Sequence, residues 1–380
     1  MNDFLLWGLG VLIFLTIVAV SIGLHEAGHM IVARKLGLKV PRFFIGFGPT
    51  LFSKKFKNAE YGIKALPIGG FVEIFPPDKD APDDSNKTKN EKDFETNMLS
   101  HVSPWKRILV FFAGPAVNLV LGVLILTMTF WTTPFKTATQ EIDSVAQCSE
   151  TVACGAQTSG IQKGDYITKI NGKTVTSTND ISDEVKGSSV DLTVKRNSGE
   201  KTITVPIHDG KIGINYVVNE HSRSLPESVG LVGTLIWSNV EAIAELPSRV
   251  GQTVEVLFGA DRTDESLASI VTVGRLYGHV SASDEITDHD KLVQYSYYAG
   301  AINLGIGFIN LLPLLPLDGG RIAIAIVDSV RRNFMKLFGK IYTPTSAKFA
   351  MAFASVSVVI VFATMGLVIL TDIVSPVDFG

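Results

Sequence analysis

Four long runs without a charged side chain limit what this chain can fold into. They cover residues 4–24, 108–135, 292–317 and 349–371. A helix needs about 20 predominantly apolar residues to cross a hydrocarbon core of about 30 Å. Hydrophobic residues make up 46% of the 380-residue chain and charged residues only 19%, a balance that is unusual in a soluble protein. The sequence therefore predicts a polytopic α-helical membrane protein with four transmembrane helices.

The first of these runs predicts a retained transmembrane helix and not a cleaved signal peptide. Only Met1, Asn2 and Asp3 precede it, so it has no basic n-region. It is also longer than a usual signal-peptide core, and it lacks a small-residue cleavage motif.

The distribution of basic residues predicts the orientation of the spans. Arginine and lysine gather between runs one and two and between runs three and four, at Arg34, Lys35, Lys106, Arg107, Arg321, Arg331, Arg332, Lys336, Lys340 and Lys348. By the positive-inside rule these loops face the cytoplasm, so both termini and segment 137–291 are expected on the extracytoplasmic side. A net charge of −3 argues against nucleic acid as a partner.

The first predicted cytoplasmic loop carries strand signals at residues 37–74. A turn is expected at Gly-Phe-Gly-Pro, residues 46–49, and a break at Gly69-Gly70. We expect a β-hairpin that lies against the cytoplasmic face of the membrane. Residues 76–97 are rich in Asp, Lys, Asn and Pro and predict a solvated linker.

The extracytoplasmic segment contains a compact α+β pattern. Residues 160–175 combine a Gly-Asp turn, an apolar strand and an Asn-Gly hairpin signal, and further strands follow. Residues 222–283 look helical in patches. The two cysteines, Cys148 and Cys154, share this segment and are open to two interpretations, a small disulfide loop or two free thiols.

The pentapeptide His-Glu-Ala-Gly-His follows the first run directly. On a helix, His25 and His29 lie one turn apart on the same face and can share a metal ion. A catalytic Zn²⁺ takes a third protein ligand and keeps one position open for water. Glu26, beside the first histidine, is placed to take a proton from that water. The alternative is a chance match in which the histidines only cap a helix at the membrane interface.

Topology predicts where the third ligand lies. Spans one and three both run from the outside to the cytoplasm, so their C-terminal ends reach the same side of the membrane. The only ionisable residue at the end of span three is Asp318, which Gly319-Gly320 follow. Ionisable residues inside a membrane are candidates for function by default. We expect Asp318 at the depth of His25 and His29; the alternative for Asp318 alone is an interfacial helix end.

Two prolines, Pro313 and Pro316, interrupt span three near its end. Proline removes an amide donor, and broken helices occur in membranes only where the backbone lines protein or a water-filled cavity. Asn310 then has two roles open to it: a hydrogen bond to a substrate or a developing oxyanion, or satisfaction of the broken helix. In span two, Gly114 and Asn118 of the stretch G-P-A-V-N are expected to support helix packing.

Together these motifs resemble the site-2 protease family of intramembrane zinc metalloproteases. The residues are H-E-A-G-H in span one, G-P-A-V-N in span two, G-G-F-V in the cytoplasmic loop, and N-L-L-P with L-D-G-G in span three. The likeness is greatest to the bacterial regulator-of-sigma-E-protease type. The stretch G-I-Q-K-G-D-Y-I-T-K-I-N-G resembles the PDZ domain of that type, here in a single copy. The second proline of span three departs from the family pattern N-L-x-P-x-P-x-L-D-G by one position.

The resemblance implies a role for each candidate residue. It implies Zn²⁺ as the cofactor, with His25, His29 and Asp318 as its ligands. Glu26 would be the catalytic carboxylate, and Asn310 would contact the substrate. The implied reaction is hydrolysis of peptide bonds in transmembrane segments during regulated intramembrane proteolysis.

The resemblance also implies partners and a location. Substrates would be single-pass membrane proteins such as anti-sigma factors, already trimmed by an upstream extracytoplasmic protease. The extracytoplasmic PDZ domain would act as a size filter or a sensor of that first cut. The chain would be a multi-pass protein of the bacterial cytoplasmic membrane, in contact with the lipid bilayer.

We therefore divide the chain into eight segments. Four are expected to span the membrane: 1–35 with the zinc motif, 105–136, 292–320 with the third metal ligand, and 349–380 with the extracytoplasmic tail. The others are the cytoplasmic loop 36–104 with its hairpin, the PDZ-like domain 137–218, the extracytoplasmic helical connector 219–291 and the cytoplasmic loop 321–348.

Two other classes of function would use the same residues. A metal transporter or sensor would hold a metal at His25, His29 and Asp318 without chemistry. An inactive scaffold would be built around the PDZ-like module. Neither class requires Glu26 to act as a base.

Overall fold

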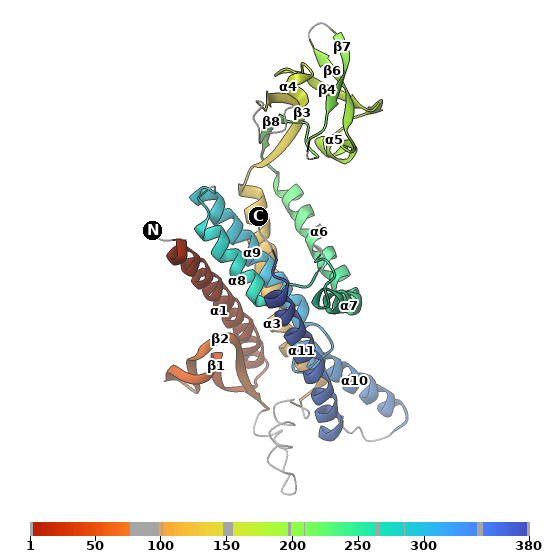
Figure 1. Ribbon diagram of the computed structural model, residues 1–380. Coiled ribbons are helices and arrows are strands. Elements are labelled where there is room, and N and C mark those ends of the chain that lie inside the picture. The colour runs from red at the N-terminus through yellow and green to blue at the C-terminus, as the bar shows by residue number, and fades with distance from the viewer. Residues whose placement is uncertain are drawn as a thin grey trace. The chain divides into compact units, whose positions relative to one another are not determined.

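The computed structural model describes residues 3–76, 99, 102–146, 155–196, 199–208, 210–262, 266–284, 286–339 and 345–377. Contacts within the chain divide it into two compact units. The sheet unit is Phe130–Leu225, and the helical unit combines Met1–Thr129 with Pro226–Gly380. Figure 1 shows the elements of each unit, coloured along the chain.

Helices dominate the helical unit. They are α1 (Asp3–Lys35), α3 (Pro104–Thr132), α6 (Leu225–Ala244), α7 (Leu246–Leu257), α8 (Ile270–Ala282), α9 (Asp288–Asn310), α10 (Asp318–Leu337) and α11 (Ala347–Val374). Among the residues that the structure describes, α1, α3 and α11 are long and apolar enough to cross a membrane. The pair α6 and α7, bent by 70°, would be a fourth candidate if it forms one broken span. The apolar helices therefore support a membrane protein with three to four candidate spans.

The predicted third span, 292–317, is not one continuous helix. α9 ends at Asn310, and α10 begins at Asp318. Pro313 and Pro316 lie in the gap between them. Proline has no amide hydrogen to donate, so a break at this position was expected. α9 is not among the helices apolar enough to be candidate spans. Polar residues such as Asn303 lower its hydropathy, and Asn303 is buried against neighbouring helices.

Glycines set the distances between α1, α3 and α9. A Cβ atom on Gly28 of α1 would lie 2.6 Å from the carbonyl oxygen of Ala113 on α3. A Cβ atom on Gly300 of α9 would lie 2.5 Å from Cγ of Leu126, also on α3. Small residues let membrane helices approach closely. These contacts bring α1 and α9 directly against α3.

The hairpin predicted at 37–74 is present as β1 (Lys39–Phe56) and β2 (Ala59–Phe75), which pair antiparallel. Its hairpin turn lies at Lys57-Asn58. The chain also reverses direction near the turn expected at 46–49 and near the break expected at Gly69-Gly70, because residues 60–63 pair with residues 52–55 on one side and with residues 42–45 on the other, and residues 42–45 pair in turn with residues 70–73. Gly46 and Gly69 have positive φ angles of 90° and 87°. Glycine adopts this conformation without strain, so each strand can reverse direction there and remain in the sheet.

The two long strands fold back on each other. Residues 42–45 pair with residues 60–63 and also with residues 70–73, and the end of β1 pairs with the start of β2. In this register, residues 42–45 run through the middle of the hairpin. The last part of β2, from Gly70 to Phe75, pairs with β1 along one side and forms an edge of the sheet.

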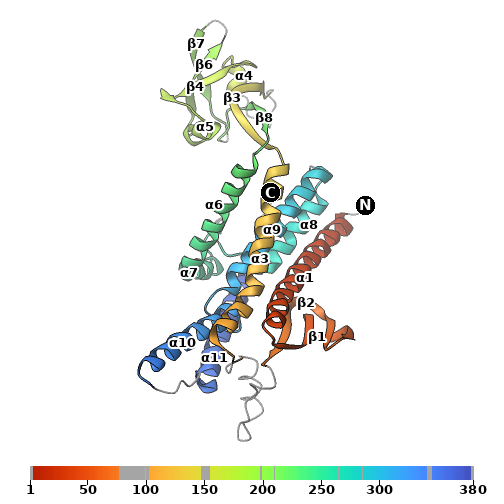
Figure 2. The same cartoon turned by 180° about the vertical axis from the view of Figure 1, so that it is seen from behind.

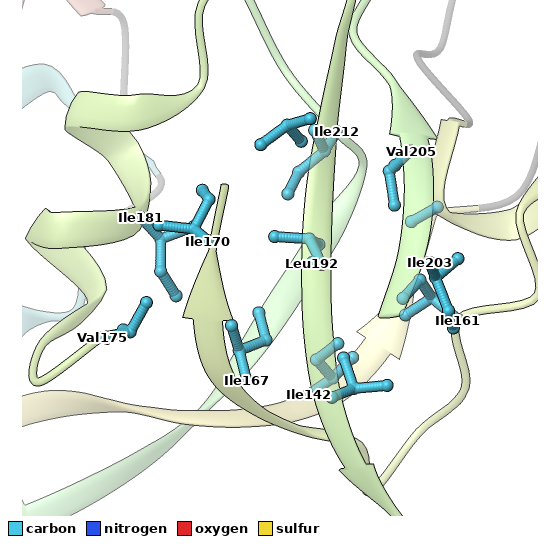
Figure 3. Close-up of a cluster of buried hydrophobic side chains, with 13 residues drawn as sticks. Ile142, Ile161, Ile167, Ile170, Val175, Ile181, Leu192, Ile203, Val205 and Ile212 are labelled. Atoms are coloured by element: carbon cyan, nitrogen blue, oxygen red, sulfur yellow. The ribbon is translucent and has the colours of Figure 1, made fainter. Parts of the chain in front are cut away.

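In its described residues, the sheet unit is built on six strands. They are β3 (Phe135–Val145), β4 (Tyr166–Ile170), β5 (Lys173–Thr174), β6 (Ser189–Arg196), β7 (Gly199–Pro206) and β8 (Ile214–His221). The strand order is β7-β6-β4-β3-β8, with β5 paired to β4. Two short helices, α4 (Gly155–Thr158) and α5 (Thr178–Glu184), complete the unit. Figure 3 shows its own hydrophobic core, in which Ile142, Ile167 and Leu192 are fully buried.

The sheet unit is wider than the PDZ-like domain predicted at 137–218. The reason is the pairing of β3 with β8, which joins Phe135 to His221. The predicted connector 219–291 holds α6, α7 and α8. Cys148 and Cys154 lie outside the described residues, as does nearly all of the predicted linker 76–97.

A buried carboxylate anchors the turn before β4. Asp165 is 1% exposed and accepts hydrogen bonds from Arg196 Nε and Nη2, each at 2.6 Å, and from the Gln162 amide at 2.9 Å. Burial alone would raise the pKa of Asp165, but the hydrogen bonds from Arg196 and Gln162 outweigh burial and lower that pKa below its ordinary 3.8. The stabilisation is therefore complete above pH 3.8 and is lost as the pH falls through the lowered pKa.

We expect Asp165→Asn to lower the free energy of unfolding of the sheet unit by about 2 kcal/mol, because charged hydrogen bonds are replaced by weaker neutral ones. Hydrogen exchange of the buried β4 and β6 amides in the full-length protein measures the change. The matched control is Asp143→Asn, whose partner Lys163 is exposed, and it should leave exchange almost unchanged. Equal effects of the two substitutions would contradict this account.

Candidate metal centre

Two buried histidines of α1 face the same point. His25 and His29 are four residues apart on the helix, and each is 6% exposed. Their Nε2 atoms lie 3.2 Å apart, and their ring centroids lie 4.8 Å apart at a near-perpendicular angle. The spacing predicted from the sequence therefore brings both imidazoles together, with α1 packed on α3.

Asp318 joins the two histidines from the other end of the chain. Its Oδ2 atom lies 3.0 Å from His25 Nε2 and 3.1 Å from His29 Nε2. The ligand atoms of these three buried residues all lie within 4.8 Å of one another. Asp318 is the first residue of α10, and the backbone after it is tightly packed: a Cβ atom on Gly319 would lie 2.2 Å from the Leu311 carbonyl oxygen. This close packing fixes the start of α10 beside α1.

Hydrogen bonds on the far side of each ring fix the histidine tautomers. His25 Nδ1 donates to Asn118 Oδ1 at 2.6 Å, and His29 Nδ1 donates to the Val110 carbonyl oxygen at 2.7 Å. Carbonyl oxygens only accept, so each Nδ1 carries a proton, and in the neutral imidazole each Nε2 then presents a lone pair. Two lone pairs and a carboxylate oxygen therefore face one another in a buried space.

This arrangement fits a zinc ion. Three electron-pair donors that point at one another repel unless a cation lies between them. Zinc binds histidine nitrogen at about 2.0–2.1 Å, so neighbouring ligand atoms of a tetrahedral site lie about 3.3 Å apart. The observed separations of 3.0, 3.1 and 3.2 Å are close to that value. Two imidazoles and one carboxylate are also a donor set that zinc prefers in catalytic sites.

A chain of buried amides orients the first histidine. Asn118 uses its NH₂ group to donate to Asn303 Oδ1 at 2.9 Å and to the Ser21 carbonyl oxygen at 3.3 Å, so its own Oδ1 is left to accept from His25. Asn303 in turn donates to Ser21 Oγ at 3.0 Å and to the Ala299 carbonyl oxygen. The support expected from Asn118 is thus a direct bond to a histidine. The sequence analysis missed Asn303. The signal that could have found it is a single amide side chain among apolar and glycine neighbours in an uncharged run.

Gly114 of α3 leaves one side of the cluster open. A Cβ atom there would lie 2.2 Å from His29 Nε2 and 2.8 Å from His25 Nε2. No L side chain fits at that distance, so only glycine leaves this face of the two imidazoles free. Gly114 was expected to support helix packing. Its missing side chain also leaves space beside the candidate metal position.

Glu26 is half-buried and lies near both the cluster and the hairpin. It is close enough to His25, His29 and Asp318 to interact with them electrostatically. A Cβ atom on Gly70 of β2 would lie 2.9 Å from Glu26 Cγ. The edge segment of β2 therefore runs beside this carboxylate.

The structure does not join Asn310 to this cluster through a hydrogen bond among the described residues. Asn310 is the last residue of α9, and its Nδ2 donates to the Ile306 carbonyl oxygen of the same helix at 3.0 Å. In this arrangement the amide satisfies the end of the broken helix. A contact between Asn310 and a substrate stays a prediction.

Comparison with known proteins identifies the family. The chain matches peptidase family M50 over residues 13–361, a span that includes His25, His29 and Asp318. The chain belongs to peptidase family M50, the site-2 proteases. The predicted family is confirmed, and with it the enzyme class, a metalloprotease, and the zinc cofactor.

Curated relatives match along nearly the whole chain. Zinc metalloprotease Rip1 of Mycobacterium tuberculosis is 29% identical over 411 residues, which cover 97% of this chain and 98% of the relative. Zinc metalloprotease Rip1 of Mycolicibacterium smegmatis is 29% identical over 419 residues, with 98% and 99% covered. A putative zinc metalloprotease of Nostoc sp. is 27% identical over 339 residues, with 85% and 87% covered.

We expect Gly114→Ala to reduce the zinc content of the purified protein severely if His25 and His29 hold the metal, because the added methyl group would displace the His29 ring. The matched control is Gly305→Ala on α9, where a Cβ atom meets nothing within 4 Å. Elemental analysis of both variants measures zinc per chain. A Gly114→Ala protein with full zinc content would show that the metal lies elsewhere.

Proposed function

We propose that this chain hydrolyses peptide bonds in or beside the transmembrane segments of other membrane proteins, with zinc held by His25, His29 and Asp318. The observation that carries the proposal is the convergence of the three buried ligand atoms within 4.8 Å. The family is one of proteases, and the candidate centre lies between helices that are apolar enough to span a bilayer. A substrate would therefore meet the site at membrane depth.

Glu26 is the proposed catalytic carboxylate. When bound, zinc lowers the pKa of its water toward about 7 and polarises the scissile carbonyl. Glu26 then takes the proton of the attacking water and delivers it to the leaving amine nitrogen. The fixed tautomers support this division of labour, because both histidines keep their lone pairs for the metal and have no proton to exchange at Nε2.

The edge segment of β2 is the proposed cradle for the substrate. A transmembrane helix hides its backbone amides, so it must unwind before a protease can attack them. An extended peptide can add to an exposed strand edge through main-chain hydrogen bonds. Gly70 lies beside Glu26, and the absence of a side chain there lets a substrate backbone come close to the carboxylate.

The sheet unit and the location complete the proposal. We infer that the unit has the PDZ topology and acts as a size filter or sensor, and that both termini and this unit are extracytoplasmic. Substrates would be single-pass proteins of the bacterial cytoplasmic membrane, such as anti-sigma factors, after a first cut by an extracytoplasmic protease. The relatives named Rip1 come from bacteria, which supports the bacterial setting.

We expect Glu26→Gln to lower the rate of substrate cleavage by about a hundredfold or more, because general acid–base catalysis is lost. Zinc content should stay at the wild-type level. Accumulation of truncated membrane stubs in cells measures cleavage, and elemental analysis measures zinc. Glu241→Gln, on an exposed side chain of α6, is the matched control and should cleave normally.

The same variant separates the alternatives. A metal transporter would still move metal with glutamine at this position, and an inactive scaffold would be indifferent to it. Full cleavage by the Glu26→Gln protein would contradict the proposed role of the carboxylate.

We expect a proline in the β2 edge to slow cleavage without loss of zinc, because proline cannot donate to an added strand. Successive backbone amides of a strand point to opposite sides, so Val72→Pro and Glu73→Pro each remove an amide on a different side of β2. The variant that removes the amide facing the open edge should have the lower rate of cleavage. Lys54→Pro, in the other arm of the hairpin, is the control. Unchanged turnover in both edge variants would rule out strand addition at this segment.

A further inference from the structure

α10 carries an apolar face that no described segment of the chain covers. Ile326, Val327, Val330, Phe334, Leu337 and Phe338 are between 49% and 84% exposed. At 3.6 residues per turn, Ile326, Val330, Phe334 and Leu337 lie within roughly 80° of one another around the helix. Exposed apolar patches of this kind mark surfaces that meet another molecule or a membrane.

The opposite face of α10 is already used for packing. Ile324 lies in a buried cluster with Leu315 and Ala350. Asp328 is 1% exposed and accepts a 2.7 Å hydrogen bond from Arg107 Nη1 and a 2.6 Å hydrogen bond from Thr345 Oγ1. These contacts hold the first half of the helix to α3 and α11 and leave the apolar face turned away from the bundle.

The second half of α10 is positively charged. Arg331, Arg332 and Lys336 are exposed, and residues 329–339 contain no acidic side chain. Arg332 and Lys336 lie on the side of the helix opposite the apolar face, and Arg331 lies at its border. A helix with one apolar face and a basic opposite face is typical of helices that lie in the plane of a membrane surface.

The position of α10 supports the same occupant. The helix is not a candidate span, because its arginines, lysine and aspartates exceed what a span of this length carries. It leaves the bundle at the end where α1 finishes in Arg34 and Lys35, and both views show it running outward from that end (Figures 1 and 2). Basic side chains of this kind complement the anionic lipid headgroups of a cytoplasmic leaflet.

We propose that the second half of α10, residues 329–338, docks on the anionic lipid surface at this end of the helical unit. Phe334 and its apolar neighbours enter the boundary between headgroups and acyl chains, and Arg331, Arg332 and Lys336 contact lipid phosphates. Because α10 is one continuous helix that begins at Asp318, the lipid surface also holds the helix that carries this carboxylate. The docking does not rest on the proposed protease function, since it concerns depth in the membrane and not cleavage.

Spin labels on the full-length protein test the docking. Single cysteines replace Phe334, on the apolar face, and Arg332, on the opposite face, in a chain with Cys148→Ser and Cys154→Ser. In nanodiscs that contain phosphatidylglycerol, collisions with oxygen relative to a water-soluble nickel chelate should be several-fold more frequent at position 334 than at position 332. Equal access of the chelate to both labels would show a helix free in water and would overturn the proposal.

A second comparison tests the role of lipid charge. The triple variant Arg331→Gln, Arg332→Gln, Lys336→Gln is labelled at position 334. Its ratio of oxygen collisions to chelate collisions should be several-fold lower than that of the protein with its native charges, because the label lies less deep in the membrane. The matched control neutralises Lys186, Lys195 and Lys201, which are exposed on the sheet unit, and should leave the ratio unchanged. Protection of position 334 from both oxygen and chelate would indicate a second copy of the chain on this face and would also overturn the proposal.

Discussion

The mutual approach of His25 Nε2, His29 Nε2 and Asp318 Oδ2 is the constraint on which the helical unit depends. All three atoms carry electron pairs, and they lie 3.0 to 3.2 Å apart in a buried space. Without a cation this contact is repulsive, and burial in a medium of low dielectric constant strengthens the repulsion. With zinc, the same geometry could supply three ligands. Segments almost 300 residues apart in the chain must therefore meet within a few tenths of an ångström.

The surrounding helices achieve this accuracy with small residues and buried polar contacts. Gly28 and Gly300 let α1 and α9 reach α3, and Gly114 leaves space beside the imidazoles. Asn118 ties α3 to His25 and to Asn303 of α9. Near the start of α3, the buried pair of Arg107 and Asp328 joins that helix to α10, the helix that begins at Asp318. Each of these polar contacts fixes how two helices are rotated relative to each other. Apolar packing alone would specify that rotation less strictly.

The same end of the helical unit gathers the elements that a membrane-embedded protease would need. Glu26 lies between the histidines and the edge of β2, so a peptide held on that edge would come close to the carboxylate. α10 starts at the candidate metal centre and ends in a surface that is both basic and apolar. In the arrangement that we propose, α10 connects the lipid surface to Asp318, and the contact of Gly70 with Glu26 brings the substrate strand to α1.

Local sequence patterns determined much of this protein. The spacing of His25 and His29 is enough to predict a shared face, because helix geometry depends only on neighbours along the chain. The uncharged runs indicated apolar helices, and Pro313 and Pro316 indicated the break before Asp318, because proline acts on its own turn. Tertiary structure decided the rest. Cross-strand pairing decided that residues 42–45 and 60–63 lie side by side in the middle of the hairpin, since glycines at 46 and 69 indicate where the chain can reverse but not which segments then pair. The rotation of α9 about its axis decided that Asn303 reaches Asn118 while Asn310 bonds to its own helix, because a partner across a helix interface is set by packing and not by local sequence.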